Sequence, residues 1–240
     1  VVEGAIKVGD EANFKVDRYK RLAIQRNHSA THLLDQALRD VLGEDVKQAG
    51  SLVDENKLRF DFSHNKALTK EEIKRVEDIV NREIVNQELV TKEIVDYKES
   101  QKMGAIGLFE DKYKDKVRVV SMGDYSKELC GGCHVNYTSD ILIFKIKQES
   151  SVSAGVRRIE ALTGEKAFEY LNDKSNKLNI VADRLNTNTN NITNRIDSLE
   201  NEIDKLKSEI SRLKTTNSSD IVSELKKDIR EIKGINLLVK

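Results

Sequence analysis

The stretch RNHSATHLLDQALRDVLG, residues 26–43, predicts the first helix of the fold and half of a metal site. Its apolar residues recur every three or four positions, which is the spacing of one helix face, and Gly43 ends the pattern. His28 and His32 stand four residues apart, so both imidazoles share a face of the helix and can bind one ion. The apolar face consists of Ala30, Leu33, Leu34, Ala37, Leu38 and Val41.

The other half of the predicted metal site is the run Cys130-Gly131-Gly132-Cys133-His134. Thiolate and imidazole are donors that suit zinc. Three of the four histidines in the chain fall within the two motifs, and only His64 lies outside them. We therefore predict one mononuclear Zn²⁺ site formed by His28, His32, Cys130 and His134.

Three alternatives to this assignment follow from the same residues. Zinc proteases carry His-Glu-x-x-His with the Glu as general base, but Ser29-Ala30-Thr31 separates the histidines here, which argues against protease chemistry. Cys130 and Cys133 could form a redox pair, although no βαβ pattern surrounds them. Cys133 could also replace Cys130 or His134 as a ligand, and this alternative stays open.

The first ~165 residues predict an α+β fold, because runs of short strands occur together with at least two helices. Residues 1–25 are expected to form short strands, with a turn at Gly9-Asp10 between them. Thr69, with Glu72 three residues later, predicts a capping box before a second helix that continues to Ile84. The alternation of polar and apolar residues predicts strands at Asn13–Asp17 and Leu58–Phe62, and further strands are expected at Val90–Val95, Val117–Ser121 and Ile141–Ile146.

After Thr163-Gly164 the pattern becomes that of a helical tail with a heptad seam. The Asn- and Thr-rich residues 186–191 predict either a hinge or a soft spot in one continuous helix. A second break is expected at Thr215–Ser219, followed by a short helix that carries Ile221, Leu225, Ile229 and Ile232. The seam residues are Ile192, Ile196, Leu199, Ile203, Leu206, Ile210 and Leu213.

Composition limits the classes of protein that fit. Lysine plus arginine and aspartate plus glutamate both number 41, so no overall field attracts nucleic acid and any RNA contact must be local. Two cysteines give no disulfide framework, and no apolar run approaches the ~20 residues that span a bilayer. We expect a cytoplasmic protein without a membrane partner. The chain lacks an initiator Met and stops on an apolar run, which predicts a piece of a longer protein.

Four segments together resemble the editing domain of the alanyl-tRNA synthetase family: Arg26–Leu34, Leu58–His64, Glu128–Val135 and Gly155–Gly164. Cys133 departs from that pattern, which more often has Thr there. The resemblance implies that residues 1–25 end a small β-barrel, giving the core a partial N-terminal barrel. Residues 26–165 would form the zinc-dependent editing domain, residues 166–233 a helical coiled-coil linker, and residues 234–240 the start of a truncated C-terminal module.

The resemblance also implies post-transfer proofreading, that is, hydrolysis of Ser-tRNA(Ala) and Gly-tRNA(Ala), with the acceptor end of tRNA(Ala) as partner. A homodimer could form through the helical tail. Rival functions are a freestanding editing hydrolase, a zinc-stabilised tRNA-binding module without hydrolysis, a threonyl-tRNA synthetase editing domain, and a helical assembly protein.

The candidate catalytic residues are Thr31, Gln48, Gly131 and Gly132. The candidate tRNA contacts are Arg157, Arg158 and the lysines near Lys98 and Lys102. His64 is expected to be structural.

Overall fold

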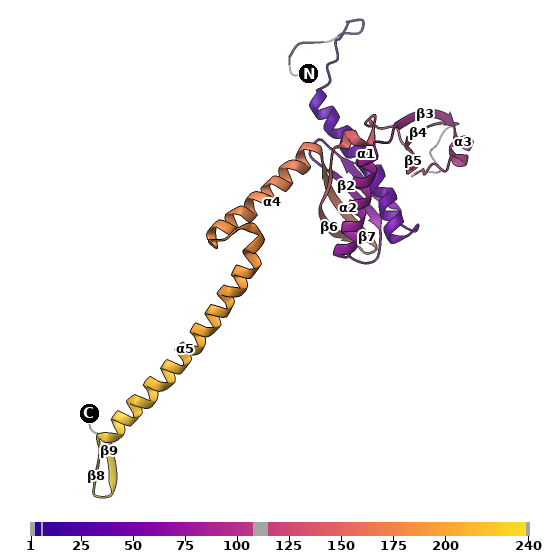
Figure 1. Ribbon diagram of the computed structural model, residues 1–240. Helices are drawn as coiled ribbons and strands as arrows, with labels where there is room; N and C mark the ends of the chain where they lie inside the picture. The colour runs from indigo at the N-terminus through magenta and orange to yellow at the C-terminus, as the bar shows by residue number, and fades with distance from the viewer. Residues whose placement is uncertain (1–2, 6, 108–114, 239–240) are drawn as a thin grey trace. The chain divides into compact units, whose positions relative to one another are not determined.

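The computed structural model describes residues 3–5, 7–107 and 115–238. The chain divides into two compact units, residues 1–171 and residues 172–240. The first unit mixes helices with two antiparallel sheets (Figure 1), which confirms the predicted mixture of helix and sheet. No closed barrel occurs in the described part of the chain.

The main layer of the first unit is a four-stranded antiparallel sheet with two helices packed against it (Figure 1). The helices are α1 (Arg18–Leu42) and α2 (Lys70–Val85). Buried Phe60 and Phe62 from β2 belong to the same core as Leu33 and Leu34 from α1. In spatial order the strands are β1 (Gln48–Val53), β2 (Leu58–Ser63), β7 (Val156–Thr163) and β6 (Phe144–Ser153).

A smaller sheet positions the second half of the metal site. It comprises β3 (Val90–Asp96), β4 (Lys116–Met122) and β5 (Ser126–Leu129), with the short helix α3 (Tyr97–Lys102) following β3. The strand β5 ends directly before Cys130, so its pairing with β4 fixes where the cysteine-containing loop begins.

The prediction of strands in residues 1–25 is wrong for the described residues. Residues 7–17 include no strand, and α1 begins at Arg18, nine residues before the predicted start at Asn27. The Asp17 side chain accepts a hydrogen bond from the Lys20 amide and so caps this helix. The alternation at Asn13–Asp17 forms no strand because a strand needs a neighbour to pair with, and none lies beside this segment in the described chain.

The other predicted elements of the first unit are mostly confirmed. Thr69 and Glu72 form the complete capping box at the start of α2, and strands occupy the predicted positions in β2, β3 and β4. The strand expected at Ile141–Ile146 starts only at Phe144, because Thr138–Ile141 forms a 3₁₀ turn and Leu142 has a positive φ of 73°. The strands β1, β5 and β7 were not predicted.

The tail is helical, with an interruption where the sequence predicts one. The helix α4 (Gly164–Arg184) ends before Asn186, which has a positive φ of 51°, and α5 (Ile192–Lys227) begins after a 3₁₀ turn. The interpretation of one continuous helix is therefore wrong. The Asn188 side chain accepts a hydrogen bond from the Asn191 amide and so caps the 3₁₀ turn that precedes α5.

The second predicted break, at Thr215–Ser219, is wrong, because the backbone of α5 continues through it. Thr, Asn and Ser each cost a helix only about 0.5 kcal/mol relative to Ala, so their presence alone does not stop one. The helix expected after this break is confirmed at Ile221 and Leu225, which lie in α5, but it is wrong for its end, since β8 (Ile229–Ile232) is a strand. This strand pairs with β9 (Ile235–Leu238) around Lys233 and Gly234, whose positive φ angles suit a two-residue hairpin turn.

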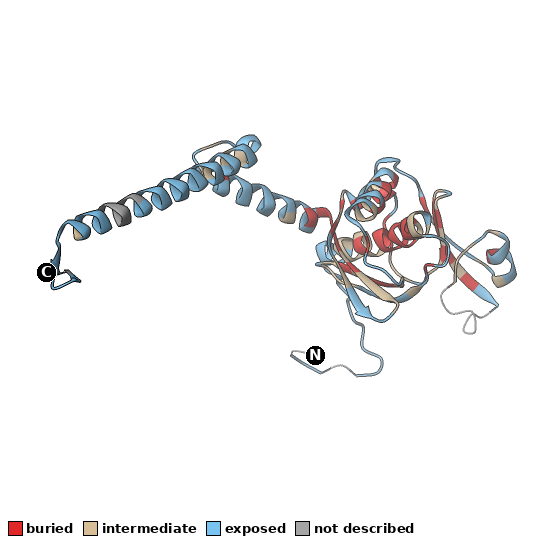
Figure 2. Cartoon of the chain, turned by 90° about the horizontal axis from the view of Figure 1, so that it is seen from below, coloured by how far each residue is buried: buried red, intermediate tan, exposed pale blue. Residues whose placement is uncertain are grey.

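Much of the heptad seam of α5 is exposed in the part of the chain that the structure describes. Ile203, Leu206, Ile210 and Leu213 are each about half exposed, as the pale blue of α5 in Figure 2 illustrates. A search of the described helices found none long and apolar enough to cross a membrane.

Candidate metal centre

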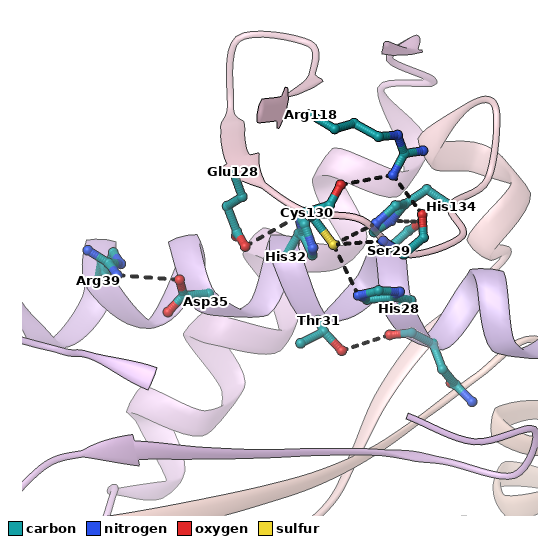
Figure 3. Close-up of polar contacts among 12 residues, drawn as sticks. His28, Ser29, Thr31, His32, Asp35, Arg39, Arg118, Glu128, Cys130 and His134 are labelled. Carbon is teal, nitrogen blue, oxygen red and sulfur yellow. Dashed lines mark hydrogen bonds and ion pairs between the residues drawn. The ribbon is translucent and has the colours of Figure 1, made fainter. Parts of the chain in front are cut away.

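The structure brings the four predicted metal ligands together (Figure 3). His28 and His32 come from α1, while Cys130 and His134 come from the loop after β5. Their ligand atoms all lie within 4.8 Å of one another. The Cys130 Sγ lies 3.4 Å from His28 Nε2 and 3.3 Å from His134 Nε2. Segments about 100 residues apart in sequence thus meet around one point.

The donor set and its distances fit a zinc ion. In a tetrahedral zinc site, bonds of about 2.1 Å to nitrogen and 2.3 Å to sulfur put neighbouring sulfur and nitrogen atoms about 3.5 Å apart. The two sulfur–nitrogen distances in this cluster are close to that value. The cluster includes Cys130 and not Cys133, which supports the predicted ligand over its alternative.

Each ligand histidine also has a contact at the ring nitrogen that faces away from the cluster. His134 Nδ1 lies 3.1 Å from the hydroxyl of fully buried Ser29, which also accepts a hydrogen bond from the Val135 amide. His32 Nδ1 lies 3.4 Å from a carboxylate oxygen of buried Glu128, although the two are not aligned as a hydrogen bond. The His28 ring hydrogen-bonds the backbone of Cys133. Such contacts fix ring orientation and so preorganise a metal site.

The electrostatics of the cluster favour neutral imidazoles, which is the form that binds metal. The pKa of His134 is lowered to about 2 and that of His32 to about 3, first by burial and then by the neighbouring histidines and the charge of Arg118. Burial also lowers the pKa of His28. In the absence of a metal, burial raises the pKa of the Cys130 thiol, while a hydrogen bond from the Gly132 amide and the charge of Arg118 oppose this.

The two glycines of the loop differ in their surroundings. A Cβ on Gly132 would lie 1.9 Å from His28 Cε1, whereas a Cβ on Gly131 would meet nothing within 4 Å. The Gly132 amide donates to Cys130 Sγ at 3.4 Å. Gly132 therefore serves the cluster through its missing side chain and its bond to sulfur, and Gly131 is exposed at its edge.

The other candidate catalytic residues lie in different settings. Thr31 is buried on α1, and its hydroxyl donates to the Asn27 carbonyl at 2.8 Å. Gln48 is half-buried at the start of β1, opposite Phe62. Within the described chain no hydrogen bond or ion pair joins Gln48 to the four ligands.

The predicted tRNA contacts lie outside the cluster. Arg157 pairs with Glu149 at 2.5 Å, and Arg158 binds both carboxylate oxygens of Asp61 at 2.6 and 2.7 Å. Lys98 and Lys102 are exposed on α3.

His64 lies away from the metal ligands. Its ring stacks on Phe62, and its amide donates to the Gly155 carbonyl.

Sequence reasoning missed three residues around the cluster, namely Ser29, Arg118 and Glu128. The spacing of the ligands gave no signal for Arg118 or Glu128, which reach the site through the pairing of β4 with β5. Ser29 lies within the first motif, beside His28, but its complete burial and its contact with His134 are known only from the structure.

Known proteins resemble this chain in the region of the cluster and beyond it. The family described as "Threonyl and Alanyl tRNA synthetase second additional domain" matches residues 117–160, which include Cys130 and His134. The chain is 50% identical over 182 residues to alanine–tRNA ligase 1 of Lachnoclostridium phytofermentans, covering 76% of the chain and 21% of that protein.

Two further relatives give the same result. The alanine–tRNA ligase of Cupriavidus necator is 52% identical over 179 residues, which is 75% of this chain and 20% of the relative. That of Bacillus pumilus is 53% identical over 174 residues, which is 72% of this chain and 20% of the relative. The chain thus spans about a fifth of the length of these curated relatives. At this level of identity over most of its length, the chain is homologous to a segment of the alanyl-tRNA synthetases.

Proposed function

We propose that this chain carries a zinc-dependent editing activity that hydrolyses Ser-tRNA(Ala) and Gly-tRNA(Ala). The observation that carries the proposal is the convergence of three imidazoles and one thiolate within 4.8 Å of one another. Half of this cluster lies in the segment that matches a domain of threonyl- and alanyl-tRNA synthetases.

The proposed reaction meets a physical need. A pocket built for alanine excludes larger side chains, but it cannot strongly reject the smaller glycine or a serine that only adds a hydroxyl. Differences of that kind are limited to a few kcal/mol, so a second, hydrolytic site is required for accuracy. That site must recognise what alanine lacks, which for serine is the hydroxyl.

His28, His32, Cys130 and His134 would hold the zinc, which when bound supplies a positive charge that can polarise an ester carbonyl. Thr31 is our candidate for sensing the serine hydroxyl. Its own proton is engaged by the Asn27 carbonyl, so its oxygen keeps lone pairs that can accept a hydrogen bond. Gln48 remains the second polar candidate.

The glycine loop would assist at the carbonyl oxygen. The Gly132 amide is directed at the Cys130 sulfur, so the exposed Gly131 is the better candidate to face a developing oxyanion. Attack of a water on the ester carbonyl and cleavage of the bond to the ribose oxygen would release the amino acid and an intact tRNA.

The acceptor end of tRNA(Ala) is the proposed partner. Arg157 and Arg158 each have a carboxylate neighbour, so phosphate would have to compete with Glu149 and Asp61 for them. The unpaired seam of α5 supports a homodimer through the tail as a further proposal, and we place the activity in the cytoplasm, where tRNA charging occurs.

A deacylation assay tests the proposal. Purified chain should release serine from Ser-tRNA(Ala) faster than alanine from Ala-tRNA(Ala), and chelation should abolish the difference. His32→Ala removes one ligand and should behave as the chelated protein. Equal hydrolysis of both esters, or full serine release after chelation, would rule out the assignment.

One observation favours a second candidate, a zinc-stabilised tRNA-binding module without hydrolysis. Four protein ligands make a closed set, which is typical of structural zinc, whereas catalytic zinc usually has three protein ligands and an open position. Under this alternative, chelation would unfold the first unit. Circular dichroism would report the loss of secondary structure, and a binding assay would show that tRNA binding is lost with it.

A further inference from the structure

Arg118 is bound to the cysteine loop at three points. It lies on β4, the central strand of the small sheet, and its carbonyl accepts a hydrogen bond from the Cys130 amide at 3.0 Å. Its Nη1 donates to the Cys130 carbonyl at 2.9 Å and to the Gly132 carbonyl at 2.8 Å (Figure 3). One residue therefore holds both peptide groups of Cys130 and the carbonyl of Gly132.

The half-buried Arg118 side chain binds backbone carbonyls of the loop. Among the residues that the structure describes, no carboxylate forms an ion pair with Arg118. A buried or half-buried guanidinium is costly unless its donors are satisfied. Here the backbone carbonyls of the metal-binding loop accept hydrogen bonds from the guanidinium, so the side chain and the loop stabilise each other.

The loop that Arg118 holds has little freedom in the cluster. The Gly132 Cα lies so close to the His28 ring that no side chain fits between them, and the Gly132 amide points at the Cys130 sulfur. A shift of this turn would move the sulfur relative to all three imidazoles. Metal sites tolerate deviations of only about 0.2 Å in their bond lengths.

We infer that Arg118 is a positioning residue of the metal centre: by binding the Cys130 and Gly132 carbonyls it sets the place of the thiolate against the three imidazoles. It thereby controls metal affinity and ligand geometry without touching the metal. This inference rests on the metal-binding part of the proposed function.

The test compares variants of the full 240-residue chain. Arg118→Met keeps much of the length of the side chain and removes every donor, whereas Arg118→Lys keeps a positive charge and loses the planar guanidinium. Lys116→Gln is the matched control. Lys116 is exposed and lies on the same strand two residues away, and its substitution removes one positive charge, as Arg118→Met does. Zinc affinity is measured by competition with a chromophoric chelator. The visible and near-ultraviolet spectrum of the cobalt(II)-loaded protein reports geometry and the thiolate bond.

The dissociation constant for zinc should rise about 10- to 100-fold in Arg118→Met, as for other outer contacts of metal ligands. The thiolate-to-cobalt band should weaken or shift, Arg118→Lys should lie between, and the control should match the unaltered chain. Zinc affinity and cobalt spectra equal to those of the control would overturn the inference. If Arg118→Met does not fold, a folded Arg118→Lys with unaltered affinity and spectrum overturns it. Absence of zinc binding by the unaltered chain would instead remove the proposed function, and the inference with it.

Discussion

Replacing Gly132 by alanine should disable the metal centre, because the added methyl group would collide with a metal ligand. The new Cβ would lie 1.9 Å from His28 Cε1 and 2.4 Å from His28 Nδ1. Non-bonded carbon atoms normally approach no closer than about 3.5 Å, so the ring or the loop must move by roughly 1.5 Å. A metal site tolerates about 0.2 Å, so the imidazole and the thiolate can no longer share the ion at bonding distance.

We expect Gly132→Ala to weaken zinc binding by at least about 100-fold, which corresponds to about 2.7 kcal/mol. The assay is a zinc titration against a competing chelator, with circular dichroism to verify that the protein stays folded. Gly131→Ala is the matched control, since its Cβ would meet nothing within 4 Å. Neither glycine has a positive φ, so backbone strain does not distinguish the two variants.

Two results would refute this reasoning. If Gly132→Ala and Gly131→Ala both keep the zinc affinity of the unaltered chain, His28 does not occupy the place next to Gly132 when metal is bound. A loss of affinity in both variants would point to backbone freedom of the loop rather than to the collision.

Three further predictions concern other parts of the first unit. Ser29→Ala leaves the buried His134 Nδ1 and the Val135 amide without their hydrogen-bond partner, so the free energy of unfolding should fall by about 2 kcal/mol and zinc affinity should fall with it; urea denaturation with unaltered stability would contradict this. Thr69→Ala removes the cap of α2 and should cost about 1 kcal/mol in the same assay, without changing zinc affinity. Burial raises the pKa of Asp35, so its ionisation costs the folded state free energy as the pH rises above the unfolded value of about 4. Asp35→Asn should therefore gain stability relative to the unaltered chain as the pH rises above the unfolded pKa, and a stability difference that does not change with pH would show that the carboxyl is not destabilised by burial.

Local signals in the sequence predicted several elements correctly because their physics is local. The capping box of Thr69 and Glu72 needs only residues three positions apart, and it is present as predicted. The interruption before α5 likewise follows from a run of poor helix formers around Asn188. The metal ligands could be proposed because the four-residue spacings within each motif put two donors within reach of one ion.

Signals that depend on a partner were weaker guides. The alternation at Asn13–Asp17 is that of a strand, yet none of the strands described in the structure pairs with it, and a helix begins at Arg18 instead. The polar run at Thr215–Ser219 has low helix propensity, yet α5 continues because each residue costs too little to stop it. The sequence pattern alone does not show whether a segment will find a partner strand or whether a helix will continue through residues of low propensity.

The surroundings of the metal ligands show why a motif predicts less than a site. The helical period states that His28 and His32 share a face, but it does not state what lies opposite that face. Gly132 is 104 residues away from His28 in sequence, and only the fold brings it so close that a single methyl group would not fit. Arg118 reaches the same loop because the pairing of β4 with β5 ends one residue before Cys130. The residues that set the affinity of this centre are therefore specified by strand register, which the spacing of the ligands does not encode.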